Sequence, residues 1–156
     1  MKKPTLQEKI NKIKEIIKNN WDEWMENLIW YWAEEREHDL RSQDIGLIKD
    51  NLERYGYAEH WKYDADGFEW ELIDWAIEEA EKQGIRFTDD ELESIYHDHP
   101  NELYDLQVKF YAEATEKLNK KLVDYLKELF SNCQVEEFHN KIIIERKNKK
   151  EEGVGE

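Results

Sequence analysis

The sequence predicts a mainly α-helical domain, a compact arrangement of about five to six helices with a small C-terminal β-hairpin or strand. Apolar residues recur every three or four positions along most of the chain, as they do on the buried face of a helix. Gly (6) and Pro (2) are scarce among the 156 residues, as long helices require. After Asn132 the pattern changes to two short segments around a His139-Asn140 turn, which is typical of a hairpin.

The composition fits one folded domain with a polar surface. Seven Trp, eight Tyr and five Phe supply bulky core material, although the mean hydropathy is −1.02 and 39% of residues are charged. Aromatic content this high argues against disorder. We therefore expect residues 1–146 to form a single helical domain with a C-terminal β element, and residues 147–156 to form a disordered tail.

The sequence also indicates a cytoplasmic location. Cys133 is the only cysteine, so an internal disulfide is excluded and a reducing compartment is favoured. No apolar stretch is long enough to span a bilayer, and the first residues lack the apolar block of a signal peptide.

The first expected helix is basic. Thr5-Leu-Gln-Glu8 has the form of a capping box, in which the Thr and Glu side chains each satisfy a backbone amide of the first turn. Ile10, Ile13 and Ile17 follow at helical spacing with lysines between them. We expect Asn19-Asn20 to end or bend this helix before the next one.

Residues 21–40 predict a Trp-rich helix with two different faces. At about 100° per residue, one face is apolar and is formed by Trp21, Trp24, Met25, Leu28, Ile29 and Trp32. The opposite face carries Glu23, Glu26, Glu34 and Glu37, with Trp30 among them. An indole on a carboxylate face is either a second packing surface or a contact for a partner.

Four further helices and a hairpin follow. The helices are expected from Ser42 or Gln43 to Tyr55, from the capping sequence Asp66-Gly-Phe-Glu69 to about Gln83, from Thr88 to about His97 and from Pro100 to Leu129. Gly56 and Gly84 suit helix C-termini, and Thr88-Asp-Asp-Glu91 is another capping-box pattern. Their expected core positions are Ile45, Ile48, Leu52, Tyr55, Ile73, Ala76, Ile77, Ala80, Leu103, Leu106, Phe110, Ala114, Leu118, Leu122, Leu126 and Leu129.

The hairpin of residues 134–146 needs a partner, because an isolated hairpin is marginal in water. Ile142 and Ile144 point to one side of their strand and Ile143 to the other, so both faces carry apolar groups. We expect the hairpin to lie on the helices, to pair with residues 61–63, or to pair with a second chain.

The negative charge is concentrated in one section. Residues 21–105 contain 26 Asp and Glu against seven Lys and Arg, and they contain all seven Trp. Such a field repels nucleic acid and attracts basic proteins, so direct nucleic-acid binding is not expected.

No residue pattern predicts catalysis, a metal or another cofactor. Glu93, His97 and His99 form the most metal-like cluster, but a histidine at a helix C-terminus is favoured by the helix dipole alone. Cys133 has no basic activator beside it, and the chain has no Gly-rich phosphate loop. The protein is therefore expected not to be an enzyme.

The carboxylate rows predict a surface that binds a basic partner. A second row lies beside Trp75 in the 67–83 helix and consists of Glu71, Asp74, Glu78 and Glu81. Steps of three or four residues correspond to roughly 5 Å along a helix, which is of the same order of magnitude as the spacing of about 3.4 Å between backbone phosphates. Such rows can imitate a phosphate backbone.

In composition the chain resembles the small acidic DNA-mimic proteins by which phages and plasmids block restriction or CRISPR enzymes. The resemblance implies an anti-restriction or anti-CRISPR inhibitor that occupies the basic site of a nucleic-acid-handling partner. Two alternatives remain open. One is an immunity protein or antitoxin against a basic nuclease toxin, and the other is a structural assembly protein in which the long helix and the hairpin form an oligomer interface, including that of a homodimer.

Overall fold

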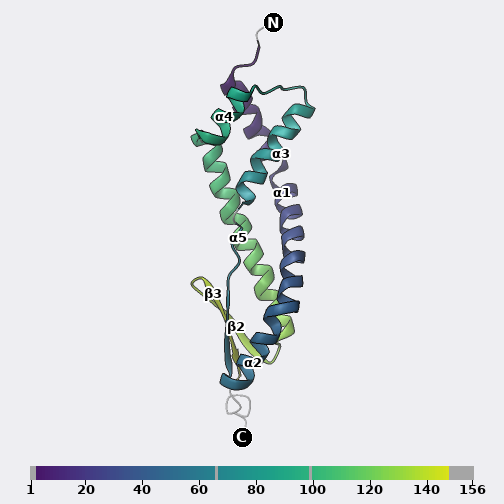
Figure 1. The fold of residues 1–156 in the computed structure, drawn as a ribbon, viewed down its shortest axis with the longest axis vertical. Coiled ribbons are helices and arrows are strands. Elements are labelled where there is room, and N and C mark those ends of the chain that lie inside the picture. Colours follow the sequence, from purple (N-terminus) through teal and green to yellow (C-terminus); the bar gives the residue numbers. More distant parts are fainter. Residues whose placement is uncertain (1–2, 66, 99, 148–156) are drawn as a thin grey trace. The chain divides into compact units, whose positions relative to one another are not determined.

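The computed structural model describes residues 3–65, 67–98 and 100–147, and these residues are mainly helical with a small three-stranded antiparallel sheet (Figure 1). This confirms the predicted class, although the helices divide differently from the prediction. The elements are α1 (Leu6–Asp39), a π-helical segment η1 (Leu40–Asp44), α2 (Ile45–Tyr55), β1 (Tyr57–Trp61), α3 (Phe68–Lys82), α4 (Asp89–His97), α5 (Asn101–Leu129), β2 (Cys133–Phe138) and β3 (Lys141–Arg146).

Helix α1 is continuous, so the predicted break at Asn19-Asn20 is wrong. The amide nitrogen of Asn20 donates a hydrogen bond to the carbonyl of Ile16, 2.8 Å away, and so satisfies its side chain within the helix. Asn lowers helix stability only slightly, and the buried residues Ile17 and Met25 on either side anchor the same helix in one core. The capping box at its start is confirmed, because the hydroxyl of Thr5 accepts from the amide of Glu8 at 3.1 Å.

The chain also stays helical beyond α1, so the predicted helix start at Ser42 or Gln43 is wrong. The π-helical segment η1 joins α1 to α2, and its Leu40 is buried. Helix α2 ends at Gly56, whose φ of 72° is the left-handed conformation that glycine adopts easily. Tyr55, predicted to face the core, is instead 71% exposed.

The chain forms two compact units, and their boundaries fall inside α1 and α5. Unit 1 consists of Met1–Leu28 and Ala65–Ala114, and unit 2 consists of Ile29–Asp64 and Thr115–Glu156. The single-domain organisation stays a prediction. The core of unit 1 combines the apolar faces of its four helical segments, and its largest fully buried side chains are Ile13, Ile17, Met25, Leu72, Ile73, Leu103 and Phe110.

Two predicted start and stop signals in unit 1 are confirmed. The hydroxyl of Thr88 accepts a hydrogen bond from the amide of Glu91, and the Glu91 carboxylate accepts one from the amide of Thr88, which completes the capping box of α4. Gly84 has a φ of 91° just after α3, where a residue with a side chain would be strained. Asp66, expected to help cap α3, lies outside the described residues.

The sheet of unit 2 has the strand order β1-β3-β2, with both pairs antiparallel. The predicted hairpin is confirmed. Its partner strand is Tyr57–Trp61, which overlaps the predicted residues 61–63 at Trp61, and the Lys62 amide donates a hydrogen bond to the Asn140 carbonyl at 2.9 Å. Ile144 lies opposite Ala58 on one side and Val135 on the other, and all three are buried. Helix α2 packs beside this sheet (Figure 1).

The end of α5 completes the core of unit 2 in a different register from the prediction. Leu118, Leu122 and Leu126 are buried as predicted, but Leu129 is exposed and the next residue, Phe130, is buried in its place. The predicted disordered tail begins at Lys147, and its residues 148–156 lie outside the described part of the chain. Among the described residues, no helix is long and apolar enough to cross a membrane.

Candidate partner-binding surfaces

Helix α3 presents part of its carboxylate row on the surface of unit 1. Asp74, Glu78 and Glu81 are exposed, and Glu71 is partly buried. The hydroxyl of Tyr96, on α4, donates a hydrogen bond to the Asp74 carboxylate. This bond holds Asp74 in place, whereas Glu78 and Glu81 have no ion-pair partner among the described residues.

Burial and the nearby Asp74 carboxylate both affect the pKa of Glu71. Its pKa is raised above the ordinary value of a glutamate, first because burial disfavours the charged carboxylate and then because the Asp74 carboxylate repels it. The four acids of this row therefore lie on one helix, but they differ in exposure. Ionised Glu71 loses part of its hydration, whereas Asp74, Glu78 and Glu81 are exposed.

Trp75 does not project freely as predicted. It is partly buried, and its ring packs edge to face on Trp24 of α1 with the ring centroids 5.7 Å apart. Edge-to-face geometry brings the positive edge of one ring to the negative face of the other, which is a favoured arrangement. Trp75 therefore belongs mainly to the packing of unit 1.

Two carboxylates on the α1 part of unit 1 are exposed without an ion pair to any described residue, while two of its lysines pair with acids of other helices. Glu23 and Glu26 are exposed and have no ion-pair partner among the described residues. By contrast, Lys9 lies 2.7 Å from Glu91 and Lys14 lies 3.8 Å from Glu102. Unit 1 contains 20 Asp and Glu against nine Lys and Arg, a net charge of −11.

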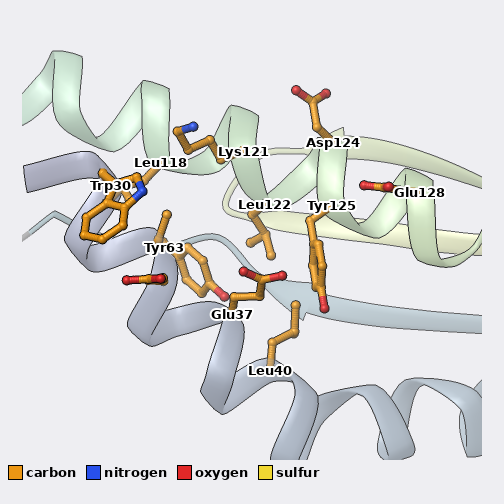
Figure 2. Close-up of a pocket in the computed structure, with 12 residues that line it drawn as sticks. Trp30, Glu37, Leu40, Tyr63, Leu118, Lys121, Leu122, Asp124, Tyr125 and Glu128 are labelled. Atoms are coloured by element: carbon orange, nitrogen blue, oxygen red, sulfur yellow. The ribbon is translucent and has the colours of Figure 1, made fainter. Parts of the chain in front are cut away.

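Trp30, Glu34 and Glu37 belong to unit 2, where they line a groove of about 370 Å³ between the end of α1 and α5. Figure 2 shows Trp30 at one end of this groove and Tyr125 at the other, with Tyr63 and Glu37 between them. Trp30 is 62% exposed, so of the two alternatives that the sequence left open for it, a packed or an exposed indole, the structure has the exposed one. The groove is lined by Trp30, Ala33, Glu34, Glu37, Leu40, Tyr63, Leu118, Lys121, Leu122, Asp124, Tyr125 and Glu128.

The central wall of the groove is held by a buried amide. Asn119 of α5 accepts a hydrogen bond from the backbone amide of Tyr63 at 2.7 Å and donates one to the Tyr63 carbonyl at 2.9 Å. These two bonds fix the backbone of Tyr63, which lies outside any helix or strand. Burial raises the pKa of Tyr63 to about 12, so its hydroxyl is neutral at physiological pH.

One edge of the groove already binds a cation from the same chain. The guanidinium of Arg41 donates from Nε to the Tyr125 hydroxyl at 2.7 Å and from Nη2 to the Glu37 carboxylate at 3.0 Å. It also lies 5.7 Å from the centroid of the Tyr125 ring. No member of this Arg41–Tyr125 contact was predicted as a site residue, because residues 84 positions apart give no signal in one sequence.

Within residues 3–65, 67–98 and 100–147, the side chains suited to metal or nucleophilic chemistry do not gather into one site. In the described part of the chain, no group of three or more His, Cys, Asp or Glu could hold a metal ion. His97 is exposed at the end of α4, and His99 lies outside the described residues. The pKa of Cys133 is raised by burial, which favours the unreactive thiol over the thiolate.

Comparison of the chain with protein-family models, with curated proteins and with solved structures gives no significant match.

Proposed function

We propose that the protein is an acidic inhibitor that occupies the basic site of a nucleic-acid-handling protein. The observation that supports this most is the net charge of −11 on unit 1, together with exposed carboxylates that have no ion-pair partner among its described residues. Unpaired exposed carboxylates can pair with the lysines and arginines of a partner without first breaking internal ion pairs.

Five carboxylates carry this role in unit 1, namely Glu23, Glu26, Asp74, Glu78 and Glu81, with Glu71 as a partly buried sixth. Their rows would stand in for phosphates, since a basic groove selected for a polyanion also attracts a helix face of acids. Trp30, with Glu34 and Glu37, would add a shaped contact in unit 2.

Capture at two salt concentrations tests this function. The tagged protein is incubated with a lysate of its host, and bound proteins are eluted either by raising the salt or by adding duplex DNA or RNA. We expect a basic nucleic-acid-binding protein that both treatments release, because exposed charges interact over only about 8 Å at physiological ionic strength. A partner that resists both salt and nucleic acid contradicts the proposal.

The second candidate is an immunity protein or antitoxin against a basic nuclease toxin. The groove around Trp30 favours it, because a shaped pocket with an aromatic anchor selects one partner rather than any basic surface. Co-expression with a nuclease toxin encoded beside it would distinguish the two. An immunity protein rescues growth against that toxin alone, whereas a mimic competes with nucleic acid for its partner.

A further inference from the structure

We propose that the groove around Trp30 binds the guanidinium group of an arginine side chain presented by a basic protein partner, and that Arg41 competes with it for the same groups. The identity of the ligand as part of a protein rests on the proposed function.

The lining of the groove is complementary to an organic cation. Four carboxylates lie along it, from Glu34, Glu37, Asp124 and Glu128, against the single ammonium of Lys121. Only Glu37 has a cationic partner among the described residues. The volume of about 370 Å³ lies within the range of about 300 to 1,000 Å³ that is usual for ligand pockets.

Aromatic rings supply the rest of the recognition. Trp30, Tyr63 and Tyr125 all line the groove, and the face of an aromatic ring attracts a cation within about 6 Å of its centroid. The Tyr63 ring already has the Arg36 guanidinium 5.8 Å from its centroid, so Trp30 and Tyr125 are the rings that a ligand cation would contact. Trp gives the strongest such attraction, and the ring of Trp30 is mostly open to solvent. A ligand cation can therefore reach it without any rearrangement of the core.

Arg41 shows which cation these groups accept. Its planar guanidinium uses two different nitrogens at once, one on the Tyr125 hydroxyl and one on the Glu37 carboxylate. A guanidinium has five donors in a fixed plane and stacks on aromatic rings, whereas an ammonium is a compact and strongly hydrated point charge. The groove therefore suits arginine better than lysine.

Arg41 is also a weak internal competitor. Its side chain is 65% exposed, and an exposed ion pair contributes little because solvent screens it. An incoming arginine can replace it on Glu37 and Tyr125 at small cost. The bonds from Asn119 keep Tyr63 in place whichever guanidinium is bound.

Titration of the whole protein with N-acetyl-arginine amide tests the inference. Nuclear magnetic resonance follows the Trp30 indole and the backbone amides of residues 118–125. We expect saturable shifts at these positions, weaker binding of the lysine analogue, and none of the neutral citrulline analogue. Equal affinity for the arginine and lysine analogues would overturn the assignment of a guanidinium site.

Two matched pairs of variants separate the groove from general attraction to an acidic protein. Trp30→Ala should weaken binding about two- to fivefold, as expected for loss of one exposed cation–π contact. Trp61→Ala should not, although Trp61 is also 62% exposed in unit 2. Arg41→Ala should strengthen binding, whereas Arg54→Ala, which removes the same charge from α2, should leave it nearly unchanged.

Equal effects of Trp30→Ala and Trp61→Ala mean that Trp30 is not a specific contact for the probe. Equal effects of Arg41→Ala and Arg54→Ala mean that the probe senses only net charge. Either result overturns the inference. Such a failure does not touch the proposed function, which is tested by release from a partner with salt and nucleic acid. In the converse outcome, the protein binds the arginine analogue as expected while its partner is not released by nucleic acid. That result supports the arginine site and contradicts the proposed inhibitor function.

Discussion

Trp24 and Trp75 pack edge to face in unit 1, with their ring planes at 69° to each other. One ring comes from α1 and the other from α3, so the pair ties together two helices that carry exposed carboxylates. Trp75 therefore takes part in the packing of α3 against α1 in unit 1.

Trp75→Ala should lower the free energy of unfolding by at least about 1 kcal/mol, because it removes both the aromatic pair and the area that Trp75 buries. Urea denaturation followed by circular dichroism measures the change. The control is Glu78→Gln, which alters an exposed neighbour on the same helix and should change stability by less than about 0.5 kcal/mol. An equally small effect of both variants would show that the Trp24–Trp75 pair is not structural.

Trp30→Ala should leave stability nearly unchanged while it weakens binding to a protein partner. The side chain is 62% exposed, so its truncation creates no cavity. Leu28→Ala is the matched control, because Leu28 is buried two positions away and its truncation should cost about 2–5 kcal/mol. Parallel thermal melts decide the matter, and a large drop for both variants would contradict the surface position of Trp30.

Charge reversal on α3 should slow association with a basic partner. Glu78→Lys combined with Glu81→Lys changes two exposed carboxylates that have no ion-pair partner among the described residues, so the fold should tolerate it. Exposed charges act mainly on the association rate, and stopped-flow or surface-based kinetics at low salt would measure the loss. Glu53→Lys combined with Glu136→Lys makes the same change of net charge on unit 2. Equal slowing by both double variants would assign the effect to net charge and not to the α3 row.

Glu71→Gln should stabilise the protein at about pH 7 and have no effect in strong acid. The folded-state pKa of Glu71 is raised by burial and by Asp74, so keeping it ionised costs folding free energy. That cost appears as the pH rises through the range between its unfolded and folded pKa values, and it is absent below both. Urea midpoints of the two proteins across this range measure it. A variant that is less stable than the parent at neutral pH would contradict the raised pKa.

Ile144→Ala should destabilise unit 2 by about 2–5 kcal/mol, because its side chain is fully buried between β1, β2 and the helices. Ile143→Ala, on the opposite face of the same strand, should cost clearly less because Ile143 is only partly buried. Thermal melts compare the two. The difference would shrink if the outer face of β3 formed a homodimer interface in solution, and sedimentation of the parent protein would then show the dimer.

The sequence alone determined the helical class, the hairpin and most of the buried positions. These follow from local rules, because apolar spacing sets which face of a helix is buried and a capping box such as Thr88 to Glu91 sets where α4 begins. It also placed Trp30 on an acidic face, since periodicity assigns faces within a single helix.

Only the tertiary structure decided what those faces contact. Asn19-Asn20 is a weak local signal for a helix end, and burial of Ile17 and Met25 on either side outweighs it. Trp75 looks like a surface residue on its own helix, but Trp24 from another helix covers part of it. The groove depends on residues far apart in the chain, among them Trp30, Tyr63 and Tyr125. No local pattern encodes such neighbours, because they meet only when α1, the segment after β1 and α5 pack together.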